Sequence, residues 1–109
     1  MESRYYNISN EVRISRNGLI EILRKALIRG DCLFWIAGFT VKDGSIILRT
    51  VDNLMGRLTI EDLLSGLREL TADILSKAVV DGEFEIGSLL ADDVDLIVQV
   101  GFFGTLVYD

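Results

Sequence analysis

Apolar and polar positions change their period several times along the chain, and each change marks a predicted element. Between residues 5 and 14 apolar side chains alternate with polar ones, which predicts a strand, or a strand with a turn at Ser9-Asn10. In the segment 19–27 apolar side chains recur at helical steps. Ser15 precedes this segment as an N-cap and Gly30 follows it as a stop, so we expect a helix of about three to four turns.

The middle of the chain carries a hairpin pattern. Residues 32–41 are apolar at both alternating sets of positions, which is typical of a strand covered on both faces, and we expect it to be central in its sheet. Asp43-Gly44 predicts a two-residue turn because both positions favour positive φ. Residues 46–51 then form the returning strand, and residues 52–57 form a loop.

Residues 60–78 have the strongest helical period, with apolar side chains on one stripe and charged side chains opposite. Thr59 and Asp62 stand before it at capping-box spacing, although the usual partner is Glu or Gln. Gly66 inside this helix costs about 1 kcal/mol relative to Ala. We therefore expect another backbone to approach closely at Gly66.

The end of the chain begins with residues 83–86, which alternate as a short strand. Residues 92–103 fit two periods, a helical stripe and a strand alternation. We favour the helix, because aspartates at its start suit a positive helix N-terminus and Gly104 would stop it. Residues 106–108 are then expected to return as a short strand.

These elements predict one α+β domain over residues 1–109, with about three helices packed on an antiparallel sheet of about three to five strands built on the 32–51 hairpin. A chain of 109 residues, half of them apolar, supplies one core.

No stretch is long and apolar enough to span a bilayer, and the first residues lack a signal-peptide pattern. A lone Cys32, expected to be buried and inert, fits a reducing compartment. We expect a cytoplasmic protein with no membrane partner.

Charge is distributed unevenly. Seventeen acidic and 11 basic residues give a net charge of −6, yet residues 78–109 contain seven acidic residues and no basic one. This balance opposes direct binding to nucleic acid, where Lys and Arg neutralise phosphates. We expect instead an acidic face that docks on the basic surface of a host protein or of another copy. The residues predicted for this face are Asp81, Glu83, Glu85, Asp92, Asp93 and Asp95.

The chain contains no histidine, so it cannot form a Ser-His-Asp triad, a Cys-His pair or a histidine-ligated metal site. Any catalysis would have to use carboxylates, and we expect a protein that is not an enzyme and needs no cofactor. The aspartates near residue 93 lack the glycine and distal glutamate of a calcium loop, so no metal site is expected.

Trp35 has two interpretations. Core packing is favoured, because its segment is apolar at both alternating sets of positions. In the alternative, a homo-oligomer binds a small molecule or nucleotide through Trp35, Arg24 and Arg29.

The basic early helix and the acidic end also predict a homodimer. Its interface is expected to use the first helix or the outer face of the hairpin, and the dimer should weaken as salt rises if charge pairing contributes.

Four segments, spread over most of the chain, carry a family resemblance: Gly30–Trp35, Leu58–Leu67, Ala91–Gln99 and Phe103–Tyr108. In their order the chain resembles small uncharacterised proteins of phages and integrated mobile elements. The resemblance implies an end built of a helix, Phe-Gly and a short strand, and it supplies no catalytic residue. It also implies a context in which small acidic proteins bind a host enzyme or a defence complex. The predicted function is thus a protein-binding module, an inhibitor of a host protein.

Overall fold

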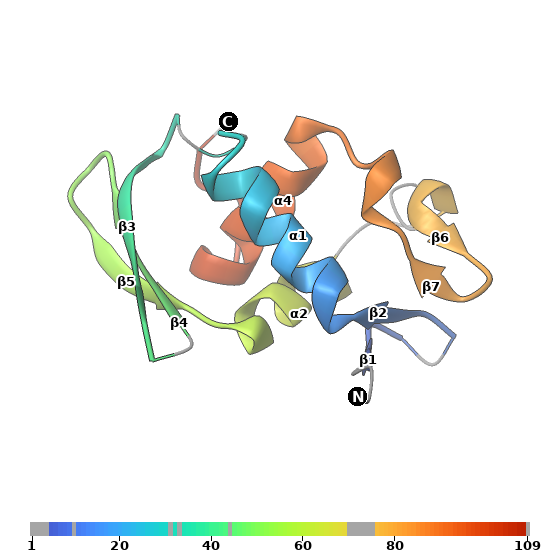
Figure 1. Cartoon of the computed structure of the whole chain (residues 1–109). Coiled ribbons are helices and arrows are strands. Elements are labelled where there is room, and N and C mark those ends of the chain that lie inside the picture. Colours follow the sequence, from blue (N-terminus) through green and yellow to red (C-terminus); the bar gives the residue numbers. More distant parts are fainter. Residues whose placement is uncertain are drawn as a thin grey trace.

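Two small sheets stand at opposite ends of a group of helices (Figure 1). The structure is a computed structural model that describes residues 5–9, 11–30, 32, 34–43, 45–69 and 76–108. The α+β class is confirmed, but the strands are divided between two sheets, of which only one is built on the predicted hairpin.

The first sheet joins the start of the chain to residues 79–84. Its strands are β1 (Tyr5–Asn7), β2 (Arg13–Ser15), β6 (Val79–Val80) and β7 (Glu83–Phe84), in the order β1-β2-β7-β6. β1 and β2 are antiparallel, so the alternative with a turn is the one observed, although Asn10 of the predicted turn lies outside the described residues. β2 and β7 are parallel through Arg13 and Glu83.

The second sheet is an antiparallel meander of β3 (Ile36–Lys42), β4 (Ser45–Thr50) and β5 (Met55–Leu58). The predicted hairpin is confirmed, because Lys42 pairs with Ser45 across a two-residue turn of which Asp43 is described, with φ 51°. The predicted loop over 52–57 is wrong in its second half. Asn53 reverses the chain at φ 66°, so β5 starts at Met55 and pairs with β4.

The prediction of a central strand over residues 32–41, covered on both faces, is wrong. The strand begins only at Ile36, and β3 is the edge of its sheet, with Phe39 43% and Val41 68% exposed. The apolar run contains two environments that hydropathy does not distinguish. Its first part is a turn in which Cys32 and Trp35 are fully buried while Phe34 is 55% exposed, and the backbone N–H groups of Trp35 and Ile36 donate to the carbonyl oxygen of Cys32.

Three described helices fill the space between the sheets: α1 (Arg16–Leu27), α2 (Ile60–Arg68) and α4 (Ala91–Phe103). Ser15 caps α1 as predicted, and Thr59 and Asp62 form the predicted capping box of α2. Residues 70–75 of the predicted second helix lie outside the described part of the chain, and residues 76–78 are helical.

The helical interpretation of residues 92–103 is confirmed, and Gly104 ends α4 at φ 84°. A short 3₁₀ helix, η1 (Ile86–Ser88), leads from β7 to α4, so the predicted strand over 83–86 ends at Phe84. The predicted strand over residues 106–108 is wrong. These residues pair with no described strand, because a side chain of α4 takes their backbone groups instead, as described below.

α2 and α4 cross at two glycines, which confirms the close approach predicted at Gly66. A Cβ atom on Gly66 would collide with the carbonyl oxygen of Ile97 and lie 3.0 Å from the backbone nitrogen of Gly101. A Cβ atom on Gly101 would lie 2.5 Å from the carbonyl oxygen of Asp62. The two backbones are therefore in contact with no side chain between them, and α4 is held at a fixed depth in the core.

Candidate functional site

Trp35 lies at the centre of a buried polar cluster. Its side chain is fully buried, and Nε1 donates a hydrogen bond of 2.6 Å to Oδ1 of Asp95, which is 9% exposed. The other carboxylate oxygen of Asp95 accepts from Nε2 of Gln99, one turn along α4, at 2.9 Å. The core position of Trp35 is thus confirmed, and a buried carboxylate satisfies its indole N–H.

Gln99 also holds the end of the chain. Its Oε1 accepts from the backbone N–H groups of Val107 and Tyr108, at 3.0 and 2.8 Å, and its Nε2 donates to the carbonyl oxygen of Tyr108 at 2.9 Å. Because the amide is fully buried and its hydrogen-bonding atoms are engaged, it acts as a clamp that brings residues 107–108 back against α4.

Aromatic rings surround this clamp. The ring of Tyr108 stacks on that of Trp35 with centroids 5.8 Å apart, and Phe102 and Phe103 approach Trp35 at 6.1 and 5.3 Å. The Tyr108 hydroxyl donates to Oδ2 of Asp52 at 2.6 Å, and this hydrogen bond raises the pKa of Tyr108. Residues 107 and 108 are therefore attached to the core, and Tyr108 also to the turn before β5.

Sequence reasoning missed Gln99, Tyr108 and Asp52. The spacing of Asp95 and Gln99 was an available signal, because side chains four residues apart meet on one helix face. The contacts of Tyr108 with Trp35 and Asp52 span 73 and 56 positions (108 − 35 and 108 − 52), and no local pattern reveals them.

The six acidic residues predicted for one face are not equivalent. Asp93 and Asp95 are each only 9% exposed. Asp95 is bound by Trp35 and Gln99, while Oδ2 of Asp93 lies 2.7 Å from Nζ of Lys77 and accepts from the backbone N–H of Leu90. Both carboxylates therefore bind within the domain and do not belong to a docking face.

Burial by itself would raise the pKa of Asp93. The hydrogen bonds from Lys77 and Leu90 and the charge of Lys77 more than offset burial, and they hold the pKa of Asp93 below its ordinary value. Asp93 is thus a capping and pairing residue at the start of α4, charged at neutral pH.

The other four acidic residues remain at the surface. Asp81, Glu85 and Asp92 are exposed, and Glu83 is half-buried, with Oε1 3.9 Å from Nε of Arg13. Within the described ranges, Asp81, Glu85 and Asp92 form no ion pair. The described residues contain no group of three or more acidic, cysteine or histidine side chains placed to hold a metal ion.

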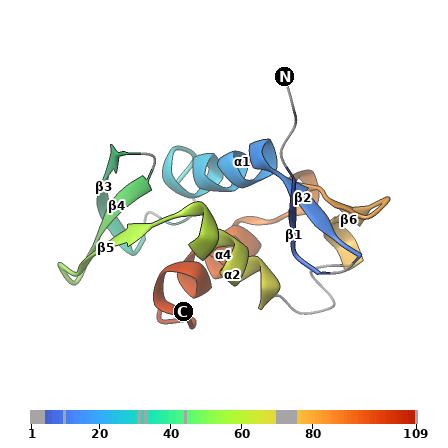
Figure 2. The same ribbon diagram turned by 90° about the horizontal axis from the view of Figure 1, so that it is seen from below.

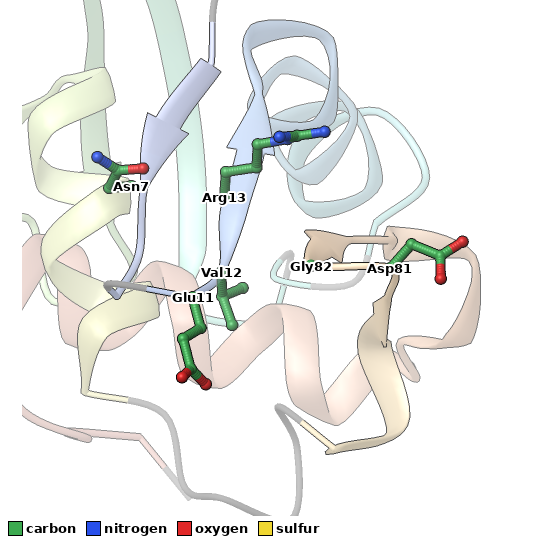
Figure 3. A pocket seen from close by; sticks show the side chains of 6 residues that line it. All are labelled: Asn7, Glu11, Val12, Arg13, Asp81 and Gly82. Carbon is green, nitrogen blue, oxygen red and sulfur yellow. The ribbon is translucent and has the colours of Figure 1, made fainter.

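A shallow pocket of about 270 Å³ opens between the β1–β2 connection and the β6–β7 turn. Its lining combines Glu11, Arg13 and Asp81 with Asn7, Val12 and Gly82, and Figure 3 shows the carboxylates of Glu11 and Asp81 and the guanidinium of Arg13 pointing in different directions. Since these charged groups do not converge on one point, we assign no ligand to this pocket.

The alternative ligand site is not assembled in the structure. Trp35 is fully buried with its indole N–H engaged, so its ring offers no surface on which a ligand from solvent could stack. Arg24 and Arg29 are exposed, and Nη1 of Arg24 lies 3.4 Å from Oε1 of Glu21 on the same helix. Cys32 is fully buried, as expected.

No protein-family model matches this sequence, and neither the curated proteins nor the solved structures give a significant match. Within the described part of the chain, no helix is both long enough and apolar enough to cross a membrane.

Proposed function

We propose that this protein is a non-enzymatic, cytoplasmic protein-binding module that docks an acidic surface on a basic protein. The observation that carries the proposal is the exposure of Asp81, Glu85 and Asp92 and their lack of ion pairs among the described residues. All three lie in the segment 78–109, which contains no Lys or Arg. Glu83 adds a fourth, partly neutralised carboxylate. We call these four residues the acidic surface; Asp93 and Asp95 are not part of it.

Surface charges of this kind act mainly on the rate of encounter, since complementary potentials steer a partner while exposed pairs contribute little to the final affinity. The resemblance to small phage and mobile-element proteins supports a bacterial host protein as the partner. If the host protein binds nucleic acid, its nucleic-acid-binding surface supplies the required basic residues. Covering that surface would inhibit the host protein.

The test is affinity capture from bacterial lysate, followed by kinetic measurement with the purified partner. The variant D81N/E85Q/D92N removes three charges from the acidic surface, and E61Q/D43N/E69Q removes three exposed charges elsewhere as a matched control. We expect the first variant to associate more slowly and with a weaker salt dependence, and the control to behave like the wild type. Equal association rates for both variants at low salt would disprove the role of the acidic surface.

A further inference from the structure

The sheet formed by β3, β4 and β5 ends in an edge strand that is apolar and uncovered. Among the described residues no strand lies beyond β3, which forms the outer limit of its sheet (Figure 2). The strand is seven residues long. β5, at the other edge, is four residues long and includes Gly56 and Arg57.

Exposure rises sharply across the sheet toward β3. Leu58, Ile46 and Val41 form one row across the three strands, and their exposed fractions are 2%, 9% and 68%. In the next row Phe102 of α4 packs over Gly56, Leu48 is fully buried, and Phe39 is 43% exposed. The helix-facing side of the sheet therefore continues its apolar surface into β3, where the helices no longer cover it.

The usual protections of an edge strand stand only at the two ends of β3. Lys42 ends the strand, and a bulge interrupts the pairing between Ile36 and Gly38. The four residues between, 38–41, carry no charge, and the chain contains no proline. Natural sheets use charges, prolines and bulges to prevent pairing at open edges, so residues 38–41 are competent to pair with another strand.

The backbone of β3 selects how a second copy would pair. In a hairpin closed by a two-residue turn the flanking residues exchange hydrogen bonds, and hydrogen-bonded and non-hydrogen-bonded pairs then alternate along the strands. Since Lys42 and Ser45 flank the turn, they form a hydrogen-bonded pair, and Val41 and Phe39 form non-hydrogen-bonded pairs with β4. The backbone N–H and C=O groups of Phe39 and Val41 therefore point away from β4.

We propose that two copies of this protein join their β3 strands antiparallel about a twofold axis at Thr40, forming a continuous six-stranded sheet. Phe39 of each copy then faces Val41 of the other, and the outward backbone groups of these residues meet. Aromatic and β-branched residues are a favourable cross-strand pair. Lys42 faces Gly38, which has no side chain, so the two Lys42 residues do not oppose each other.

This interface differs from the one expected from charge patterns, and it is independent of the acidic surface. It contains apolar side chains and backbone groups, and each copy carries a net charge of −6, so the copies repel at long range. Screening by salt therefore strengthens the dimer instead of weakening it.

The first test compares Val41→Lys with Met55→Lys by sedimentation over a wide concentration range. Both residues are strongly exposed, at 68% and 70%, so thermal melting should show both variants folded. In a twofold interface each substitution acts twice, and we expect Val41→Lys to lower the association constant roughly ten- to thirty-fold. Met55→Lys, on the opposite edge strand, should leave the constant unchanged.

The second test locates the axis. At a non-hydrogen-bonded antiparallel pair the Cα atoms lie about 4.5 Å apart, within the range that a disulfide spans. Thr40→Cys should therefore form a disulfide-linked dimer on mild oxidation. Lys42→Cys, which would face Gly38, should not, and neither should the wild type, whose Cys32 is buried.

A wild type that is monomeric at every concentration, together with Thr40→Cys that does not cross-link, would overturn the proposal. Cross-linking of Lys42→Cys in place of Thr40→Cys would overturn the twofold at Thr40. A monomeric wild type that loses a foreign partner on Val41→Lys would show that the edge receives a strand of another protein, and would equally overturn pairing between copies.

Discussion

Trp35 shows how a single side chain connects distant parts of this molecule. It lies before an edge strand, donates to Asp95 of α4, and stacks on Tyr108 near the end of the chain. Replacing it with alanine should lower the free energy of unfolding by roughly 3–5 kcal/mol, because a large buried ring is lost. Trp35→Phe should lower it by about 1–3 kcal/mol, since Asp95 loses a buried donor. Urea denaturation of both variants checks this, and a Trp35→Ala protein as stable as the wild type would contradict it.

Asp93 supplies a second prediction at the residue scale, through pH. Its folded pKa lies below its unfolded value, so its contribution to stability is complete above the unfolded pKa, about 3.9, and is lost as pH falls through the folded pKa. Lys77→Met should therefore reduce stability near neutral pH, and the difference from the wild type should shrink as Asp93 becomes protonated in acid. Denaturant titrations from neutral to strongly acidic pH measure this. A difference that stays constant with pH would exclude the Lys77–Asp93 pair as its source.

At the scale of elements, the crossing of α2 and α4 depends on Gly66. A methyl group there meets backbone atoms of α4, which cannot rotate away as a side chain can. We expect Gly66→Ala to lower the free energy of unfolding by about 1–3 kcal/mol, despite the better helix propensity of alanine. Gly87→Ala is the matched control, because a Cβ atom there would meet nothing within 4 Å. Equal melting temperatures for the two variants would show that the helices separate at little cost.

At the scale of the whole molecule, the two proposed interactions should respond oppositely to salt. Docking of the acidic surface on a basic partner loses attraction as salt rises, whereas pairing of two copies loses repulsion. Sedimentation of the protein alone and binding to its partner, measured through one salt series, should give slopes of opposite sign. Slopes of the same sign would show that one of the two surfaces has been assigned the wrong chemistry.

The sequence by itself determined the features that depend on neighbouring residues. The caps at Ser15 and Thr59, the two-residue turn at Asp43 and the stop at Gly104 were all predictable, because each follows from local backbone and hydrogen-bonding preferences. The close approach at Gly66 was also predictable, since a glycine in a strong helical pattern needs a reason.

Only the tertiary structure decided which apolar and acidic residues are covered. Residues 32–41 look uniformly apolar, yet Trp35 is buried and Val41 is exposed, because Trp35 packs against the end of α4 while Val41 lies on an edge strand. Asp92 and Asp93 are adjacent in sequence, yet one faces solvent and the other binds Lys77. Burial depends on partners far along the chain, and hydropathy and charge patterns record only the residue and its neighbours. The fold class could therefore be predicted from the sequence, while the exposure of each acidic residue and the open edge of β3 could not.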